Sequence, residues 1–344
     1  MRPYDAFLLI SFGGPESTDD VIPFLENVTR GRNIPRERLA EVGEHYYLFN
    51  GISPINQQCR DLIEAVRADF SANGMDLPIY WGNRFWAPML TDTVAQMAKD
   101  GVRRVVAMAT SAYCNYSSRR VYYNDIAAAR EAVGPDAPEI ELIRPFYDHP
   151  GFIEPLVEHV RAALERLPED RRADARLLFS AHSIPTAMAE ASGAPEHGYG
   201  PGGAYVAQLT EVARLVAERL GGGHRYELVY QSRSGPPSQP WLEPDINDRL
   251  EELAEDGVTA VAVIPYGFVS DHMEVVYDLD HEARETADRL GIDFVRASSP
   301  GTHPRFVSMM RELITEQADP RSEPVRLSGL PECRCGSADC CGPR

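Results

Sequence analysis

A histidine at the end of an apolar segment is the first candidate for chemistry. His182 follows the run 177–181 and precedes Pro185, and a short apolar run that a proline stops predicts a buried strand. In open parallel sheets, ligands bind beyond the carboxyl ends of the strands, which is where His182 would lie. An imidazole titrates near neutral pH and can accept protons from a substrate. The alternative is a histidine that only caps the strand.

Three acidic residues follow another predicted strand. Glu274, Asp278 and Glu282 stand at positions i, i+4 and i+8, which predicts one carboxylate stripe on one face of a helix. Asp271 and His272 stand at its start. Like charges at this spacing repel each other, so a divalent cation moving along the stripe would stabilise it. One histidine and a few carboxylates give a metal ion incomplete coordination, which suits a transient ferrous ion better than a structural zinc. A solvated acidic face is the alternative.

Aromatic residues gather near the predicted strand ends of the first half, in the segments 45–58, 82–89 and 111–125. Phe85 and Trp86 directly follow Arg84 in a loop, which is less typical of a core. A large, flat, apolar ligand with acidic edges would need aromatic walls together with arginine, tyrosine and serine donors.

Four cysteines crowd the end of the chain in the pattern C-x-C-x4-C-C, at positions 333, 335, 340 and 341. In a cytosolic protein such a cluster is more typical of a metal site than of disulfides. Four thiolates suit either a [2Fe–2S] cluster or zinc, and the pattern alone leaves both open. Cys59 stands inside an apolar helical pattern and is predicted to lie in the core.

The order of the predicted elements indicates an α/β fold. Eight short apolar runs alternate with helical patterns, which predicts two similar lobes, each with a four-stranded parallel sheet flanked by helices. The last helix, near 304–317, could pack on either lobe. We therefore expect an N-terminal lobe over 1–150, a C-terminal lobe over 151–317 and a cysteine-rich tail over 318–344. The predicted strands are 6–12, 77–83, 102–110, 139–145, 175–181, 225–232, 258–266 and 293–297.

Composition narrows the class of protein. The net charge of −18 disfavours nucleic acid as a partner, because nucleic-acid affinity rests on basic contacts to phosphate. No apolar run approaches the roughly 20 residues that span a bilayer, so no transmembrane segment is expected. The apolar stretch at the N-terminus is short and follows an aspartate, so it predicts a first strand and not a signal peptide. We expect a cytoplasmic protein.

Taken in order, several segments resemble the signature segments of ferrochelatases. They are "LLISFGGPE", "NGISPINQQ", "FSAHSIP", "YQSRSGPPSQPWLEPDIND" and "IPYGFVSDHMEVVYDLDHEA". The resemblance runs from about residue 5 to 317. It implies a lyase that inserts Fe²⁺ into a porphyrin in heme biosynthesis, in a cleft between two Rossmann-like lobes (a chelatase-like fold).

The resemblance also implies roles for individual residues. His182 matches the active-site histidine, which takes pyrrole protons, binds the metal, or does both. Glu274 matches the carboxylate paired with it across the porphyrin, and Asp278 and Glu282 match an acidic ladder that delivers metal or removes protons. Together with His182, these three carboxylates are the expected metal-binding residues.

Five further positions match porphyrin-binding positions of the family. Ser53 and Tyr123 match positions that hold porphyrin propionates. His45 and Tyr46 fall where some relatives have an Arg-Tyr pair, so a histidine replaces an arginine here. Phe12 stands where some relatives have a tyrosine that ligates the product iron, and a phenylalanine cannot do so.

For the tail, the resemblance favours a [2Fe–2S] cluster over zinc, because some ferrochelatases carry one on a C-terminal extension. The expected ligands are Cys333, Cys335, Cys340 and Cys341. Since adjacent Cys340 and Cys341 are awkward ligands for one cluster, Cys114 is a candidate substitute.

Actinobacterial relatives of this kind use coproporphyrin III, so we expect the product to be coproheme and a downstream coproheme decarboxylase to be a possible recipient. The alternatives are a protoporphyrin IX ferrochelatase, a cobalt or nickel chelatase for a related tetrapyrrole, and a non-catalytic heme or metal carrier. The acidic ladder favours an enzyme, because a carrier has no use for a metal delivery path.

Overall fold

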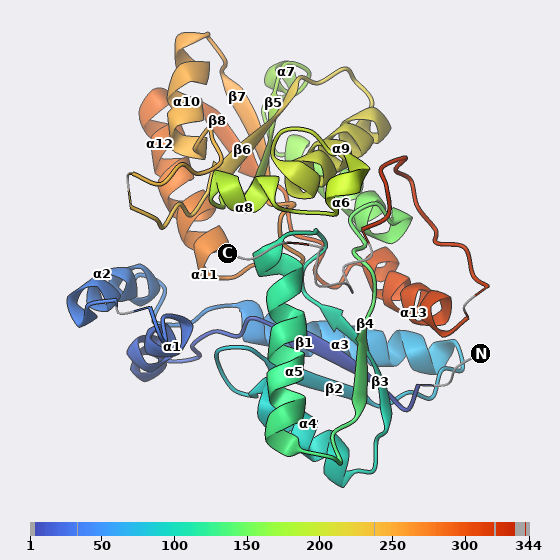
Figure 1. The fold of residues 1–344 in the computed structure, drawn as a ribbon. Helices are drawn as coiled ribbons and strands as arrows, with labels where there is room; N and C mark the ends of the chain where they lie inside the picture. Colours follow the sequence, from blue (N-terminus) through green and yellow to red (C-terminus); the bar gives the residue numbers. More distant parts are fainter. Residues whose placement is uncertain (1–3, 33, 237, 320, 334–340, 342–344) are drawn as a thin grey trace.

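Two parallel sheets form the framework of the protein (Figure 1). The computed structural model describes residues 4–32, 34–236, 238–319, 321–333 and 341. The sheets have the strand orders β2-β1-β3-β4 and β6-β5-β7-β8, and the paired strands are parallel. The predicted fold class and its eight strands are therefore confirmed. The strands are Ala6–Ser11 (β1), Ile79–Asn83 (β2), Arg104–Ala109 (β3), Glu139–Leu142 (β4), Arg176–His182 (β5), Tyr226–Gln231 (β6), Ala260–Ile264 (β7) and Asp293–Arg296 (β8).

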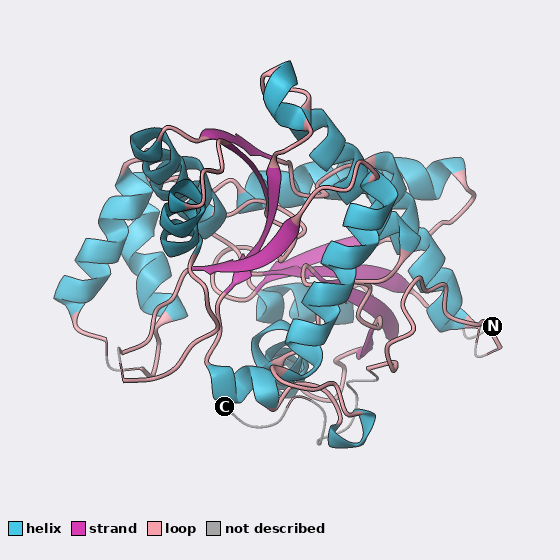
Figure 2. Ribbon diagram, turned by 90° about the horizontal axis from the view of Figure 1, so that it is seen from above, coloured by secondary structure: helices cyan, strands magenta, loops and turns pink. Residues whose placement is uncertain are grey.

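Helices connect the strands, because parallel neighbours need crossover connections. Seen from above, they surround the strands on both sides (Figure 2). The α-helices of the first half are Val21–Val28 (α1), Arg36–Tyr47 (α2), Ile55–Ala72 (α3), Leu90–Lys99 (α4) and Val121–Val133 (α5). Those of the second half are Pro150–Leu164 (α6), Glu169–Arg172 (α7), Thr186–Glu190 (α8), Gly203–Leu220 (α9), Ile246–Glu255 (α10), Met273–Val275 (α11), Arg284–Leu290 (α12) and Pro304–Ala318 (α13). Short helices of other types span Thr18–Asp20 (η1), Tyr116–Arg120 (η2), Pro195–His197 (η3) and Val276–Ala283 (η4).

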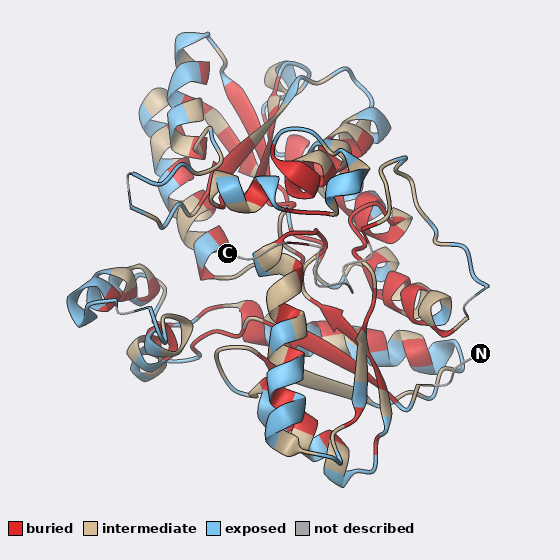
Figure 3. Ribbon diagram, in the orientation of Figure 1, coloured by how far each residue is buried: buried red, intermediate tan, exposed pale blue. Residues whose placement is uncertain are grey.

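The inner strands β1, β3, β5 and β7 are almost wholly buried (Figure 3). The largest core cluster is continuous across both lobes and contains side chains of β1, β5, α3, α6, α9 and α13. A second cluster packs α4 and α5 on the other face of the first sheet, and a third packs α10, η4 and α12 on the other face of the second sheet. Each sheet is therefore covered on both faces, as expected for parallel sheets.

The last helix joins the two lobes. We expected α13 to pack on one lobe or the other, and it packs on both, against α3 and α6. Arg311 Nε lies 2.8 Å from Asp69 Oδ2 of α3, and Arg305 Nε lies 2.9 Å from Glu154 Oε2 of α6. The boundaries drawn at residues 150 and 317 stay a prediction.

The segment after α13 returns to the connection between β4 and α6. Asp148 is fully buried in this connection. Its carboxylate accepts a 2.7 Å hydrogen bond from Arg326 Nε, and its carbonyl accepts a 2.9 Å bond from the N–H of Leu327. The segment thereby brings Cys333 back to the body of the protein. Among the described helices, none is long and apolar enough to cross a membrane.

Candidate active site

The candidate catalytic residues lie at the carboxyl ends of three neighbouring strands of the second sheet. His182 is the last residue of β5 and pairs in register with Gln231, the last residue of β6. The segment after β7 leads to α11, which carries Glu274. The sheet therefore brings together residues that are far apart in the sequence, as the position rule for parallel sheets predicts.

His182 and Glu274 face each other across a short gap. Nε2 of His182 lies 3.6 Å from Oε2 of Glu274. The other ring nitrogen, Nδ1, contacts the carbonyl of Ser183. A proton on Nδ1 satisfies that carbonyl and leaves the lone pair of Nε2 pointing toward the carboxylate. This arrangement can accept a proton or bind a metal ion at Nε2.

A second imidazole flanks the same carboxylate. Nδ1 of His272 lies 3.8 Å from Oε2 of Glu274 and accepts a 3.2 Å hydrogen bond from the N–H of Glu274. Burial lowers the pKa of His272, and the nearby Glu274 charge opposes that shift. A neutral His272 can keep this acceptor role, so it caps α11 at Glu274.

The acidic stripe does not continue as the expected α-helix. After one turn of α11 the chain forms the π-helix η4. π-helical segments inside longer helices are frequent at functional sites. The sequence pattern missed this because a four-residue spacing is close to one full turn in either type of helix. Glu274 and Glu282 are exposed and Asp278 is half-buried.

Asp278 has the most perturbed acidity of the stripe. Burial, together with the charges of Glu274, Glu282 and Asp245, raises its pKa from 3.8 to about 7, and burial is the largest cause. The hydroxyl of Ser232 donates a hydrogen bond to Asp278 Oδ2 and opposes the shift. A carboxyl with a pKa near neutrality can alternate between protonated and ionised forms under physiological conditions.

The signature segment "YQSRSGPPSQPWLEPDIND" contains two residues that contact Asp278, Gln231 and Ser232, and neither was among the predicted site residues. Gln231 is buried; its Oε1 accepts a 2.7 Å bond from Ser180, and its Nε2 donates to the carbonyl of Glu274 at 3.3 Å. Ser232 has a left-handed backbone with φ of 63°. Non-glycine residues seldom adopt this conformation, and here it accompanies the hydrogen bond to Asp278. Nothing in the local sequence pattern predicts it.

Replacing Asp278 with asparagine should stabilise the protein, and more so as the pH rises. Because its folded pKa is raised, native Asp278 keeps its proton while the unfolded chain ionises, so stability falls as the pH rises from about 4 to about 7. Asparagine mimics the protonated form and can still accept from Ser232. We expect a stability advantage that grows by about 1–2 kcal/mol between pH 5.5 and 8, measured by urea denaturation.

Asp288→Asn is the matched control for this experiment, because Asp288 is exposed on α12. It should show no growing advantage between the two pH values. An Asp278→Asn advantage that does not depend on pH would mean that Asp278 ionises at its ordinary pKa.

The far end of the stripe meets helix α2. The ring of His45 stacks on that of Tyr277, with centroids 3.9 Å apart and planes 4° apart. Burial lowers the pKa of His45, while the charge of Glu282 raises it. The expected residues His45 and Glu282 are thus brought into one electrostatic environment, between α2 and η4.

Aromatic residues form a cluster beside the stripe. Phe12 lies 4.7 Å from Phe85 between ring centroids, and Phe24 lies 6.0 Å from Tyr46 and 6.2 Å from Trp86. The buried side chain of Met273 belongs to the same cluster. Burial raises the pKa of Tyr46, and the charges of Glu274 and Asp278 add to the effect. The aromatic wall therefore adjoins the acidic helix.

The two predicted propionate positions lie in the first lobe. Ser53 is buried, and a Cβ at Gly14 would come within 2.7 Å of its Cβ, so only glycine allows this close approach. The hydroxyl of Tyr123 accepts a 3.1 Å bond from Arg119. In the described part of the chain, neither residue is hydrogen-bonded to His182 or Glu274. Their roles toward a porphyrin stay predictions.

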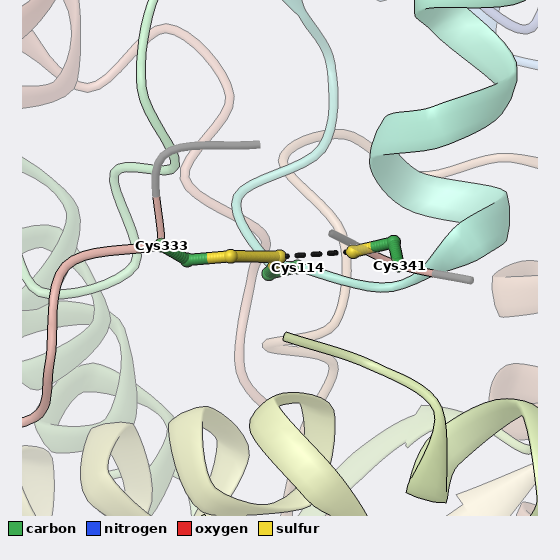
Figure 4. Close-up of side chains that lie close together, drawn as sticks. All are labelled: Cys114, Cys333 and Cys341. Atoms are coloured by element: carbon green, nitrogen blue, oxygen red, sulfur yellow. Dashed lines mark hydrogen bonds between the residues drawn. A yellow bond between two sulfur atoms is a disulfide. The ribbon is translucent and has the colours of Figure 1, made fainter. Parts of the chain in front are cut away.

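Three cysteines lie close together (Figure 4). Cys114 and Cys333 are joined by a disulfide, and Sγ of Cys341 lies 3.1 Å from Sγ of Cys114. All three are buried, and their sulfurs lie within 4.8 Å of one another. The group thus contains the candidate substitute Cys114. The predictions for Cys335 and Cys340 concern residues outside the described part of the chain.

Cys59 has no part in this group. It is buried in the core that includes α3, as the sequence predicted. Burial raises the pKa of its thiol to about 11, so it stays protonated and unreactive at neutral pH.

Comparison with known proteins identifies relatives over nearly the whole chain. The sequence model of the Ferrochelatase family matches residues 4–318. A coproporphyrin III ferrochelatase of Streptomyces coelicolor is 55% identical over 95% of this chain and 89% of its own length. One of Nocardia farcinica is 52% identical over 99% of this chain and 97% of its own. A Rhodopirellula baltica protein called ferrochelatase is 49% identical over 96% of this chain and 91% of its own.

Solved structures support the fold. The sirohydrochlorin chelatase SirB of Bacillus subtilis matches with a TM-score of 0.54 at 12% identity, covering 95% of this chain and all of that one. The chelatase-like protein DR2241 of Deinococcus radiodurans matches with a TM-score of 0.51 at 16% identity, covering 90% of this chain and 55% of that one. At such low identity the likeness concerns the fold alone.

Proposed function

Because this chain belongs to the ferrochelatase family, the metal chelatases that insert Fe²⁺ into porphyrins, we propose that it inserts Fe²⁺ into coproporphyrin III at the site formed by His182 and Glu274. The observation that carries the assignment of the site is the 3.6 Å approach of His182 Nε2 to Glu274 Oε2 at the carboxyl end of β5. The reaction joins Fe²⁺ to four pyrrole nitrogens and releases two protons.

In this mechanism His182 accepts the pyrrole protons at Nε2. The contact between its Nδ1 and the Ser183 carbonyl holds the ring in the orientation that exposes Nε2. Glu274 Oε2 lies 3.6 Å from that nitrogen and stabilises the imidazolium as it forms. Both groups can also ligate the incoming iron before the porphyrin nitrogens replace them.

The remaining carboxylates then act as a relay. Asp278, with a pKa of about 7, can take a proton from the catalytic pair and release it toward Glu282 and solvent. Its ionised form can instead hold a cation between Glu274 and Glu282. Electrostatic coupling among the three groups supports either direction of transfer, because a charge change on one shifts the others.

The aromatic wall supplies binding surface for the macrocycle. Phe12, Tyr46, Phe85 and Trp86 offer apolar faces beside the acidic helix. Binding a bent macrocycle better than a flat one would expose the pyrrole lone pairs to the metal. Ser53, Tyr123 and His45 are the proposed polar contacts at the edge of the porphyrin.

The name of the relatives supports coproporphyrin III as the porphyrin, since several at about 50% identity carry it. The test is anaerobic mixing of the protein with Fe²⁺ and either coproporphyrin III or protoporphyrin IX, followed by visible absorption. Rapid multiple turnover of coproporphyrin supports the proposal, and preference for protoporphyrin overturns the choice of substrate. Tight heme binding without metallation of either porphyrin would indicate a carrier. If coproporphyrin III is the substrate, we propose that the iron product passes to a downstream coproheme decarboxylase.

The cysteine group is the proposed site of a [2Fe–2S] cluster. Its donor set fits once the Cys114–Cys333 disulfide is reduced to two thiolates, because three buried sulfurs lie together and thiolates are the usual ligands of such clusters. Cys114, Cys333 and Cys341 would hold the cluster, with Cys340 or Cys335 as the fourth ligand. The bound cluster would supply an electron-transfer or sensing centre. Visible absorption and electron paramagnetic resonance of the purified protein separate it from colourless zinc and from a disulfide.

Replacing Glu274 with glutamine should lower the rate of iron insertion about 10²-fold or more and leave the melting temperature nearly unchanged. The amide keeps the size of the side chain but loses the charge that stabilises a protonated His182. Glu274 is exposed, so the fold does not depend on it. Single-turnover absorption and thermal denaturation measure the two effects. A large fall in melting temperature would instead make Glu274 a structural residue.

A further inference from the structure

Helix α9 connects the cysteine group to His182 through two hydrogen bonds, one at each end of a single helical turn. Cys114 lies between β3 and η2. The N–H of Cys114 donates a 2.8 Å bond to Oε1 of Gln208 on α9. Gln208 is fully buried, and its Nε2 has no acceptor among the described residues. An unsatisfied donor therefore lies on the same side-chain amide that holds the N–H of Cys114.

The connection continues along α9. Tyr205 precedes Gln208 by three residues and therefore lies on the same face of the helix. Its hydroxyl donates a 3.0 Å hydrogen bond to the carbonyl of His182. The start of the helix is fixed, because the N–H of Tyr205 donates a 2.9 Å bond to the hydroxyl of Ser192. Helix α9 thus holds Cys114 at one position and His182 one turn away.

A second connection reaches the segment that carries Glu274. The hydroxyl of Tyr113, the neighbour of Cys114, donates a 3.0 Å bond to the carbonyl of Tyr266. The next residue, Gly267, approaches β5 so closely that an added Cβ would lie 3.0 Å from Ala181. The rings of Tyr113 and Tyr205 lie 6.2 Å apart, edge to face. The segment 113–114 therefore contacts both α9, which bonds to His182, and the start of the loop that leads from β7 to α11.

From these contacts we propose that Tyr205 and Gln208 are positioning residues that couple the cysteine group to His182, so that linking Cys114 to the tail cysteines holds His182 at its working distance from Glu274. This inference rests on the proposed function, because the required distance between His182 and Glu274 is the one that iron insertion needs. Buried groups are close-packed and transmit small displacements, which gives the coupling its physical basis. The Nε2 of Gln208, which has no acceptor among the described residues, leaves a free donor on the side chain that holds the backbone of Cys114.

The test compares Cys114→Ser, Tyr205→Phe and the double variant. Each single change should lower kcat for coproporphyrin metallation about 5- to 20-fold, with KM for the porphyrin within about twofold of the wild type. The kcat of the double variant should be no lower than that of the less active single variant, because both changes break the same connection. Tyr230→Phe is the matched control: Tyr230 is also buried in the second lobe, and no hydrogen bond joins its hydroxyl to His182 or Cys114. It should leave kcat unchanged.

A spectroscopic readout makes the test independent of turnover. Histidine labelled with ¹³C at Cε1 gives a ring resonance for His182, identified by its absence in His182→Ala. Cys114→Ser and Tyr205→Phe should each move this resonance in porphyrin-free protein, and Tyr230→Phe should not. If Cys114→Ser does not fold, Gln208→Met replaces it, because it removes the acceptor for Cys114 N–H and keeps every cysteine.

Independent effects would overturn the proposal. In that case the fold-changes in kcat of the two single variants would multiply in the double variant. The His182 resonance would also stay in place in Cys114→Ser or Gln208→Met. If the wild type metallates neither porphyrin, the proposed function fails, and the resonance comparison still decides whether the cysteine group and His182 are coupled.

Discussion

Replacing His182 with alanine is expected to abolish iron insertion while porphyrin binding stays largely intact. Loss of a general base alone costs about 10²- to 10⁴-fold in rate, and His182 is also a proposed metal ligand, so the loss should lie toward the upper end. Porphyrin binding should persist because the aromatic wall belongs mainly to the first lobe and to α1 and α2. Absorption measures metallation, and quenching of porphyrin fluorescence measures binding.

His224→Ala is the control for this experiment. His224 precedes β6, at the amino end of the sheet, and its Nδ1 lies 3.3 Å from the carbonyl of Ala175. It should retain wild-type metallation. Retained turnover in His182→Ala would remove His182 from the mechanism, and loss of porphyrin binding would make it a structural support of the cleft.

The second large effect is expected on stability. Replacing Arg326 with methionine should cost about 3–5 kcal/mol of unfolding free energy at pH 7.5, because it removes one partner of a buried ion pair. Asp148 is fully buried, and its other basic partner, Arg144 Nη1, lies 3.6 Å from Oδ1. Arg326 also donates a 2.7 Å bond to the carbonyl of Leu330. Urea denaturation measures the loss.

The pH dependence of this loss has a definite sign. Burial raises the pKa of Asp148, and Arg326 and Arg144 oppose the rise. Without Arg326 the pKa should rise further, so native Asp148 keeps its proton to higher pH and stability falls over a wider range as the pH increases. The cost of the substitution should therefore be smaller at pH 5 than at pH 7.5.

Two further variants distinguish the effect of losing the Asp148–Arg326 ion pair from a general effect of removing an arginine from the segment after α13. Arg321→Met removes an arginine of the same segment that is 88% exposed, and it should cost under about 0.5 kcal/mol. Asp148→Asn in the Arg326→Met background should recover much of the lost stability, since the buried carboxylate that kept only the 3.6 Å contact with Arg144 is then replaced by a neutral amide. Equal losses in Arg326→Met and Arg321→Met would contradict the role of Asp148.

Local sequence patterns determined the framework of this protein. Runs of apolar and β-branched residues marked all eight strands, because burial on both faces of a parallel sheet demands such runs. The position of His182 after one of these runs and the four-residue spacing of Glu274, Asp278 and Glu282 selected the candidate site. The family signature segments added the chemistry.

Tertiary structure alone decided the contacts that join distant residues. It showed that the acidic stripe begins in one helical turn and continues as a π-helix, that Ser232 bonds to Asp278, and that His45 stacks on Tyr277. It also brought Cys114 to Cys341, which stand 227 residues apart. Periodicity reports which face of an element is buried, but it does not report which partner covers that face, because the partner depends on how the lobes pack.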